Sequence, residues 1–212
     1  MNPIRVLIIR NCRGITGMTG GETYLLSLLK GFDPKKVRCL LVCIVNPALG
    51  ETTWLKELKQ TGFEYVTIPI GNPFNLRDVF AVSALIKQYQ ADVIHALDHR
   101  SDLIGILSAR LTGRPVVASF LGWVNFAKGS WRATVYPWID RMILRRLDAV
   151  ITDSVAIGTE LRMGKQDPPV VAIRNGIDTA WFDPARTLAP SSVSSFAAGG
   201  DYVFGMVGRI HP

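Results

Sequence analysis

Histidine, aspartate and arginine gather in one short segment, His95-Ala-Leu-Asp-His-Arg-Ser-Asp, which begins inside an apolar run. We expect Asp98, His99 and Arg100 to fall in the loop after a strand, where their side chains could hold sugar hydroxyls or a phosphate. His95 fits either this site or a satisfied, half-buried position in the core. The segment could supply a metal ligand or two, but no third ligand is evident, so we expect no metal site.

A second candidate is the glycine-rich segment of residues 11–21, Asn-Cys-Arg-Gly-Ile-Thr-Gly-Met-Thr-Gly-Gly. Gly20 and Gly21 stand at the start of an expected helix, whose free N–H groups and positive dipole end favour phosphate. The alternative is a flexible loop that holds no ligand. No Gly-Lys-Ser/Thr follows, so the segment is not a P-loop. The glycine spacing also differs from the dinucleotide fingerprint, and Val45-Asn46 stands where a ribose-binding acid belongs, which disfavours a nicotinamide dehydrogenase.

Trp123 and the three cysteines are the remaining candidate residues. Trp123 follows Gly122 at the end of an expected strand, and it either lines a pocket or packs in the core. No Gly-x-Ser-x-Gly occurs, so a hydrolase triad lacks support. Cys12, Cys39 and Cys43 form no Cys-x-x-Cys pair and are interpreted as buried free thiols in a reducing compartment.

The elements that position these residues alternate between short β-rich runs and helical patterns. Strands are predicted at 4–10, 37–45, 64–69, 92–96, 116–120, 149–153 and 170–173. Helices are predicted at 21–32, 52–61, 76–90, 101–111, 130–147 and 155–163. Each passage between strands includes a helix-length segment, which parallel strands need and hairpins do not. We therefore expect a doubly wound, mostly parallel, Rossmann-like α/β sheet with ligands beyond the carboxyl ends of its strands.

The chain has 212 residues, which suits one full domain and a remnant better than two complete domains. Residues 1–186 form the expected domain, and 187–200 are a Ser-, Ala- and Gly-rich linker. Residues 201–212 read as the first strand of a further, truncated domain.

A net charge of +7 needs an explanation. Much of the basic charge falls in the helix predicted at 130–147, at Arg132, Arg141, Arg145 and Arg146. It fits a solvated helix surface, an anionic substrate or, with Trp131 and Trp138 nearby, an anionic membrane surface. Nucleic acid is disfavoured because no binding motif or aromatic stacking pattern is present. No run approaches the roughly 20 apolar residues of a membrane span.

Six segments, taken in order, resemble a known family. They are Gly20-Gly-Glu22, Asp92-Val-Ile-His95, Arg114-Pro-Val-Val-Ala-Ser-Phe-Leu-Gly-Trp123, Arg145-Arg-Leu-Asp-Ala-Val-Ile-Thr-Asp-Ser154, Arg174-Asn-Gly-Ile-Asp178 and Val207-Gly-Arg209. Together they resemble the GT-B-fold retaining glycosyltransferases of family 4, the relatives grouped as glycosyl transferases group 1. The resemblance covers nearly the whole chain.

The resemblance implies two Rossmann-like lobes that face a cleft, with residues 1–186 as the acceptor-side lobe. Gly20 and Gly21 would approach the donor pyrophosphate. His95, Trp123 and the loop with Asp98, His99 and Arg100 would line the acceptor side. Arg209 would be catalytic, because a cation stabilises the charge that develops on the departing diphosphate.

The implied reaction transfers a sugar from a nucleotide-sugar donor to a lipid-linked or saccharide acceptor, with no cofactor and no metal. The free cysteines and the basic helix predicted at 130–147 lead us to expect a cytoplasmic location with a peripheral association at the inner membrane face. One departure is Leu121, where the family usually carries histidine, because leucine neither donates nor accepts a hydrogen bond. His99 is a candidate substitute.

The other departure is that the donor lobe's lysine and glutamate pair do not appear, so we expect the 212-residue chain to bind donor poorly and turn over little. The alternative is a non-catalytic binding or interaction module with a Rossmann-like fold. A sugar epimerase or other dinucleotide enzyme is disfavoured by the glycine spacing and the missing acid.

Overall fold

The computed structural model describes residues 2–12, 18–69, 76–120, 131–161, 167–176 and 179, with backbone alone for 131–134, 136 and 137. Contacts group Met1–Gly176 into one compact unit and Ile177–Pro212 into a second. The predicted linker at 187–200 and the predicted strand at 201–212 lie outside the described residues, so both stay predictions.

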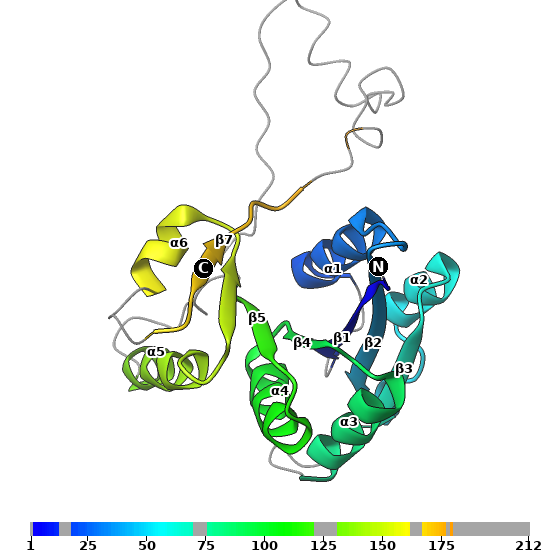
Figure 1. Cartoon of the computed structure of the whole chain (residues 1–212), viewed down its shortest axis with the longest axis horizontal. Coiled ribbons are helices and arrows are strands. Elements are labelled where there is room, and N and C mark those ends of the chain that lie inside the picture. The colour runs from blue at the N-terminus through cyan, green and yellow to red at the C-terminus, as the bar shows by residue number, and fades with distance from the viewer. Residues whose placement is uncertain are drawn as a thin grey trace, which may run out of the picture. The chain divides into compact units, whose positions relative to one another are not determined.

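The described residues of the first unit form a seven-stranded sheet in the order β3-β2-β1-β4-β5-β6-β7, and every pairing is parallel (Figure 1). Its strands are β1 (Ile4–Asn11), β2 (Val37–Val45), β3 (Tyr65–Pro69), β4 (Val93–Ala96), β5 (Val116–Phe120), β6 (Ala149–Thr152) and β7 (Val170–Ala172). The doubly wound parallel sheet predicted from the sequence is therefore confirmed.

Helices connect successive strands, with a short 3₁₀ helix, η1 (Pro47–Leu49), before α2. They are α1 (Gly20–Gly31), α2 (Thr53–Thr61), α3 (Leu76–Tyr89), α4 (His99–Thr112), α5 (Trp131–Leu144) and α6 (Val155–Leu161). Their ends fall within three residues of the predicted ones. Among the described residues, no helix combines the length and the apolar character that crossing a bilayer requires.

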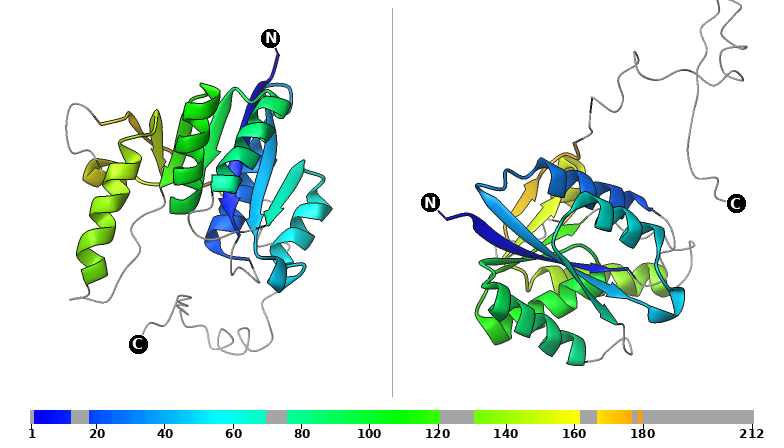
Figure 2. Two further views of the ribbon diagram at one scale, coloured as in Figure 1. Left: turned by 90° about the horizontal axis from the view of Figure 1, so that it is seen from below. Right: turned by 90° about the vertical axis from the view of Figure 1, so that its right-hand side faces the viewer.

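The helices form two layers, one on each face of the sheet. α1 and α2 pack on one face through Leu25, Leu29, Trp54 and Leu58, and α3, α4 and α5 pack on the other. Figures 1 and 2 show helices on both faces of the twisted sheet. Because both faces are covered, β2 runs through five consecutive buried residues, 40–44, rather than alternating apolar and polar positions.

Glycines end two of these helices at positions where the backbone requires them. Gly62 follows α2 with φ of +71°, and Gly113 follows α4 with φ of +68°. This left-handed conformation strains residues that carry a Cβ atom, so glycine is the residue expected there. Both glycines stand directly after the last residue of their helices.

Strands β2 and β3 are added on one side of β1, and strands β4 to β7 are added on the other, so the sheet has a switch point between β1 and β4. β1 pairs with β2 on one side and with β4 on the other, and α1 and α4 leave the two strands on opposite faces of the sheet. In open α/β sheets a crevice forms at this switch point, outside the carboxyl ends of the strands. The polar segments singled out from the sequence follow these same two strands.

Candidate functional site

Arg10 lies near the carboxyl end of β1 and reaches α1. Its Nε and Nη2 atoms donate to Glu22 Oε1 at 2.8 and 2.6 Å. Glu22 is fully buried, and its second oxygen, Oε2, accepts hydrogen bonds from the backbone N–H (3.2 Å) and the hydroxyl of Thr19. Burial alone would raise the pKa of Glu22, but the Thr19 hydrogen bond and the Arg10 charge outweigh it and hold this pKa below its ordinary value. Glu22 is therefore an ionised, buried partner of Arg10.

Asp98 joins β1 to the start of α4. Its Oδ2 accepts from the backbone N–H of Asn11 at 2.8 Å and lies 3.6 Å from Arg10 Nη1. Its carboxylate also accepts from the backbone N–H (3.1 Å) and the hydroxyl (2.7 Å) of Ser101. We call Arg10, Glu22 and Asp98 the β1–α1 cluster. It ties together the two strands at which the sheet reverses.

The predicted loop at residues 98–100 is wrong. Asp98 is the N-cap of α4, and His99 and Arg100 form the helix's first turn. Aspartate at the N-cap satisfies a free N–H group of the first turn, so the helix begins two residues earlier than its apolar pattern suggested. Arg100 then points at α3, where its Nη2 lies 2.7 Å from Oδ2 of the buried Asp78, and the Arg100 side chain itself is part-buried.

The two glycines of the α1 start differ in their surroundings. A Cβ atom on Gly21 would lie 2.7 Å from Arg10 Nη2, so glycine makes room for the guanidinium. A Cβ atom on Gly20 would meet nothing within 4 Å. Of the two predicted phosphate contacts, Gly20 has the open surroundings, whereas Gly21 has an intramolecular reason for its identity.

His95 lies within β4 and is buried, whereas His99 and Arg100 lie in the first turn of α4. His95 is 5 % exposed, and its Nε2 lies 2.8 Å from the hydroxyl of Ser119 on β5. The Tyr24 hydroxyl of α1 lies 3.3 Å from the same Ser119 oxygen. Burial lowers the pKa of His95 to about 4, so the ring is neutral at pH 7. His95 therefore positions Ser119 and Tyr24 rather than carrying charge.

His99 faces α5 instead of β1. Its Nδ1 lies 3.1 Å from Asp140 Oδ1, and the histidine side chain is 42 % exposed while Asp140 is buried. Burial raises the pKa of Asp140, against a lowering effect of His99. Asp102, one turn into α4, is also buried, and burial followed by the charges of Asp98 and Asp140 raises its pKa well above the usual range. We call His99, Asp102 and Asp140 the α5-side cluster.

Five residues of these contacts were not predicted as site residues from the sequence: Arg10, Glu22, Tyr24, Ser119 and Asp140. Glu22 does stand next to the two glycines, and a charged residue directly after two glycines at a helix start was a usable signal. The partners of the other four lie at least 12 positions away, so no local pattern points to them.

Three predicted positions, Leu121, Trp123 and Arg209, lie outside the described residues. Within the described part of the chain, no three His, Cys, Asp or Glu side chains converge as a metal site requires. The prediction that no metal or cofactor takes part stays a prediction.

The three cysteines are free, as two buried thiols and one half-buried thiol. Cys12 follows β1 and hydrogen-bonds to Cys43 of β2, and this bond together with burial raises the pKa of the Cys12 thiol. Burial raises the pKa of Cys39 to about 11. All three belong to the apolar layer under α1 and α2.

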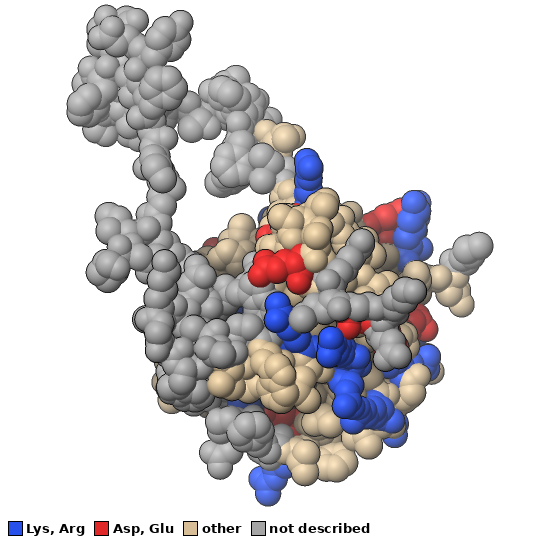
Figure 3. Space-filling view, turned by 90° about the vertical axis from the view of Figure 1, so that its left-hand side faces the viewer, with Lys and Arg blue, Asp and Glu red and all other residues tan. Residues whose placement is uncertain are grey.

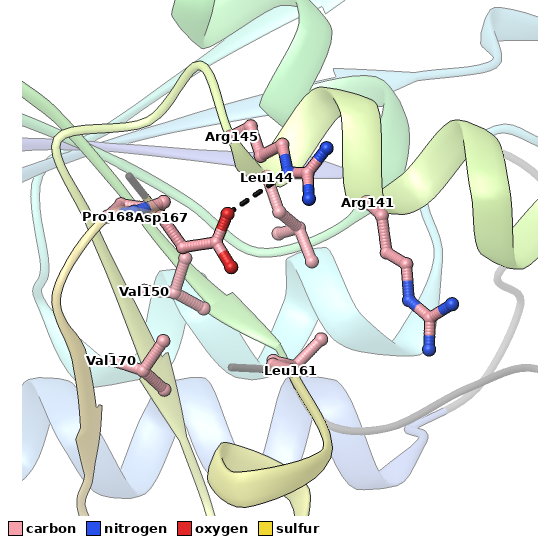
Figure 4. A pocket seen from close by; sticks show the side chains of 8 residues that line it. All are labelled: Arg141, Leu144, Arg145, Val150, Leu161, Asp167, Pro168 and Val170. Atoms are coloured by element: carbon pink, nitrogen blue, oxygen red, sulfur yellow. Dashed lines mark hydrogen bonds and ion pairs between the residues drawn. The ribbon is translucent and has the colours of Figure 1, made fainter. Parts of the chain in front are cut away.

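Of the hollows among the described residues, the following two differ most in size and lie away from these clusters. Figure 4 shows a pocket of about 20 Å³ between α5 and β7, lined by Arg141, Leu144, Arg145, Val150, Leu161, Asp167, Pro168 and Val170. Its volume suits about one water molecule, and the Arg145–Asp167 ion pair at 3.0 Å crosses its rim. A hollow of about 580 Å³ lies at the amino end of the sheet and is lined by Asn2, Pro3, Arg5, Arg38, Gln90, Asp92 and Arg114.

One comparison, with models of protein families, identifies the family of this chain, and another, with solved structures, identifies its fold. Residues 19–176 match the family model described as the glycosyl transferase 4-like domain. No curated protein matches the sequence.

Among solved structures, a glycosyltransferase from Rickettsia africae ESF-5 is similar, with 17% identity, a TM-score of 0.61, and coverage of 93% of this chain and 49% of that one. Anabaena Alr3699/HepE in complex with UDP and glucose has 16% identity, a TM-score of 0.62, and coverage of 92% and 50%. UDP-N-acetylglucosamine 2-epimerase from Rickettsia bellii has 16% identity, a TM-score of 0.50, and coverage of 76% and 41%. These likenesses show the fold, and the chain spans about half the length of the first two structures.

Proposed function

Because the chain belongs to the glycosyl transferase 4-like family, we propose that it forms the acceptor-side lobe of a retaining, nucleotide-sugar-dependent glycosyltransferase. The observation that carries this proposal is that the matched residues, 19–176, include α1, the end of β4 and α4, whose polar side chains meet at the switch point of the sheet. The proposed acceptor is lipid-linked or a saccharide. The proposed location is cytoplasmic, with a peripheral association at a membrane.

A UDP-sugar is the first donor to test, because a similar structure holds UDP and glucose. On this chain the proposed phosphate contact is the backbone at Gly20, which has open space around its Cα and lies at the positive end of α1. Arg209 is proposed to neutralise the departing diphosphate, since charge develops on the leaving oxygen during transfer.

Among the predicted acceptor residues, His99 is the strongest candidate for direct contact. It is part-exposed, and Asp140 holds its Nδ1, which leaves Nε2 to meet an acceptor hydroxyl. Asp98 already accepts from two backbone N–H groups and a hydroxyl, and Arg100 is paired with Asp78. We assign these two side chains to holding α4 in place, and Trp123 stays an acceptor contact proposed from the resemblance.

The proposal is tested by incubating the full gene product with radiolabelled nucleotide sugars and with lipid and oligosaccharide acceptors. We expect transfer from one donor, with the anomeric configuration of the donor preserved in the product by proton NMR. We expect His99→Gln to raise KM for the acceptor about tenfold, because one hydrogen bond to it is lost. Lys56→Ala, at an exposed position of α2, should leave both constants unchanged.

Inverted product would contradict the retaining assignment. The absence of any transfer, together with saturable binding of a sugar nucleotide or glycan, would favour the alternative of a non-catalytic binding module. The family that the sequence resembles usually carries a histidine where this chain has Leu121, and this departure favours the alternative.

A further inference from the structure

Three arginines line the larger of the two hollows. We call it the amino-end hollow; its volume is about 580 Å³, and it lies at the end of the sheet from which β1 starts, near the N mark of Figure 2. Arg38 belongs to β2, Arg5 belongs to β1, and Arg114 precedes β5. The proposed site of sugar transfer lies beyond the opposite, carboxyl end of the strands, so the amino-end hollow needs an explanation of its own.

The register of the strands brings these arginines into one row. Arg5 pairs with Arg38 in the parallel ladder of β1 and β2. The β1–β4 and β4–β5 registers, continued toward the amino end, set Asp92 beside Arg5 and Arg114 beside Asp92. Register partners in a parallel sheet point to the same face, because side chains alternate along each strand. The row therefore consists of three arginines and one aspartate on one face of the sheet.

The single carboxylate of this row is turned to the backbone. Asp92 Oδ2 accepts from the backbone N–H of Arg5 at 2.9 Å. Asp148 makes the same kind of bond on a neighbouring pair of strands, to the backbone N–H of Val116 at 2.8 Å. Asp92 thus extends the hydrogen bonding of the sheet, and within the described part of the chain no ion pair joins it to an arginine.

The arginines of the row differ from others in the same domain. Arg10, Arg100 and Arg145 each form an ion pair with a carboxylate, at 2.6, 2.7 and 3.0 Å. The guanidinium groups of Arg38 and Arg114 are exposed and have neither a hydrogen bond nor an ion pair among the described residues. On the α5 side, by contrast, Figure 3 shows Asp and Glu side chains among the Lys and Arg side chains. The row at the amino end therefore carries positive charge that no carboxylate offsets.

Gln90 holds the middle arginine of the row in place. Its Oε1 accepts from Arg5 Nη1 at 2.7 Å, and the Tyr89 carbonyl accepts from the same nitrogen at 3.2 Å. Gln90 has φ of +56°, a left-handed conformation in which glycine is less strained. Strain that is kept together with a side chain fixing its neighbour is typical of residues that shape a ligand site. Arg5 and Arg38 are also like charges on adjacent strands, a pairing that destabilises a sheet unless an anion offsets it.

We infer that the amino-end hollow binds a polyphosphate group. Guanidinium groups bind phosphate oxygens through paired, charge-assisted hydrogen bonds. Several of them in a row suit a chain of phosphates better than a single phosphate, because each can meet a different phosphate. The volume of the hollow lies within the range of small-molecule sites. The inference does not depend on sugar transfer.

A second hollow, next to the row, distinguishes two sources of such a group. It has a volume of about 250 Å³, shares Arg38 with the amino-end hollow, and is lined in part by Phe32, Phe63 and Tyr89. Bases stack on aromatic side chains, so a nucleoside triphosphate would place its base there and its phosphates on the row. An inorganic polyphosphate would use the row alone.

Titration calorimetry with sodium tripolyphosphate tests the inference on the 212-residue chain, with any affinity tag kept away from Asn2 and Pro3, which line the hollow. We expect saturable binding. Arg38→Gln with Arg114→Gln should weaken it at least about tenfold, because two charge-assisted contacts are lost. Arg38→Lys with Arg114→Lys should weaken it by a smaller factor, since the charge stays but the paired geometry is lost.

The matched control is Lys56→Gln with Arg77→Gln. Both residues are exposed, and they lie in the first halves of α2 and α3, toward the carboxyl end of the sheet. This pair removes the same amount of positive charge away from the hollow. It should bind tripolyphosphate within about twofold of the unaltered chain, because exposed charges at a distance are screened. Circular dichroism confirms folding of every variant.

ATP identifies the source of the polyphosphate. Binding of ATP at least about tenfold tighter than tripolyphosphate, with the difference removed by Phe32→Leu with Phe63→Leu, supports the inference with a nucleoside triphosphate as ligand. Binding of ATP no tighter than tripolyphosphate supports it with an inorganic polyphosphate.

Three results would each overturn the inference. The first is absent binding of tripolyphosphate. The second is binding that survives Arg38→Gln with Arg114→Gln or that falls equally in the control pair, because the anion would then lie elsewhere, as at the start of α1. The third is tighter binding of single-stranded DNA than of either ligand, which would indicate a nucleic-acid surface instead.

Discussion

α4 begins between two polar clusters that balance their charges differently. In the β1–α1 cluster, the Arg10 guanidinium lies between the carboxylates of Glu22 and Asp98, at 2.6 and 3.6 Å. In the α5-side cluster, two buried carboxylates face one part-exposed histidine, and the pKa values of both carboxyls are raised. In the first cluster an arginine offsets the two carboxylates and links β1 to the starts of α1 and α4, whereas in the second cluster burial disfavours the charged form of both carboxyls beside the proposed acceptor position.

The largest expected effect is from Glu22→Gln, which leaves Arg10 with a neutral partner in a buried setting. We expect a loss of about 3 kcal/mol in the free energy of unfolding at pH 7, measured by urea titration. Because the pKa of Glu22 is lowered in the folded state, its stabilisation is present above the ordinary value of 4.5 and is lost as the pH falls through the folded value. The difference between the two proteins should therefore shrink in acid.

Glu51→Gln is the control for this variant, since Glu51 and its partner Lys59 are both exposed. It should leave the urea midpoint unchanged. Equal urea midpoints for Glu22→Gln and the unaltered chain would show that the β1–α1 cluster does not fix the scaffold.

The next effect separates the two glycines at the start of α1. Gly21→Ala places a methyl group 2.7 Å from Arg10 Nη2 and should destabilise the protein by about 1–3 kcal/mol. Gly20→Ala meets open space and should not lower stability, because alanine favours a helix over glycine by up to about 1 kcal/mol. Thermal unfolding measures both, and a milder effect at Gly21 than at Gly20 would contradict the close approach of Arg10.

A smaller effect, opposite in sign, is expected in the α5-side cluster. Burial and the charges of Asp98 and Asp140 raise the pKa of Asp102 above 3.8, so its ionisation costs stability as the pH rises past that value. Asp102→Asn removes this cost. We expect the variant to be more stable than the unaltered chain at pH 7 and equal to it near pH 3, in urea titrations at the two pH values. A destabilised variant at pH 7 would mean that the ionised carboxylate is held by a favourable partner.

The smallest change in stability is expected from His99→Gln, at less than about 1 kcal/mol, because the histidine is 42 % exposed. The informative readout is Asp140. Without the lowering effect of His99, the pKa of Asp140 should rise further, and carbon-13 NMR of the carboxyl group follows it. An unchanged titration of Asp140 would contradict the proposed coupling between His99 and Asp140.

Much of the scaffold could be predicted from the sequence because its signals are local. Buried runs such as residues 40–44 mark strands, and Gly62 and Gly113 mark helix ends within their own turns. The parallel order followed because each strand is separated from the next by a helix. The start of α4 was missed because Asp98 acts as a cap while also accepting from Asn11, which lies 87 positions away.

The candidate site depends on contacts that no spacing encodes. His95 and Ser119 meet only because β4 and β5 pair in one register, and His99 meets Asp140 only because α4 packs beside α5. The sequence could name His95, Asp98 and His99 as members of one segment. It could not show that they point to three different neighbours, since that depends on which face each backbone position presents.

The rate at which the buried Cys12 thiol is chemically modified measures local opening of the protein. Cys12 is 1 % exposed at the point where β1 ends, and hydrogen bonding to Cys43 with burial raises its pKa, so a disulfide reagent finds almost no thiolate there in the closed state. Modification of Cys12 must then wait until the end of β1 separates from β2. The labelling rate therefore reports how often the strand end beside Arg10 opens, and a ligand that binds this end of the sheet would slow that rate in proportion to its occupancy.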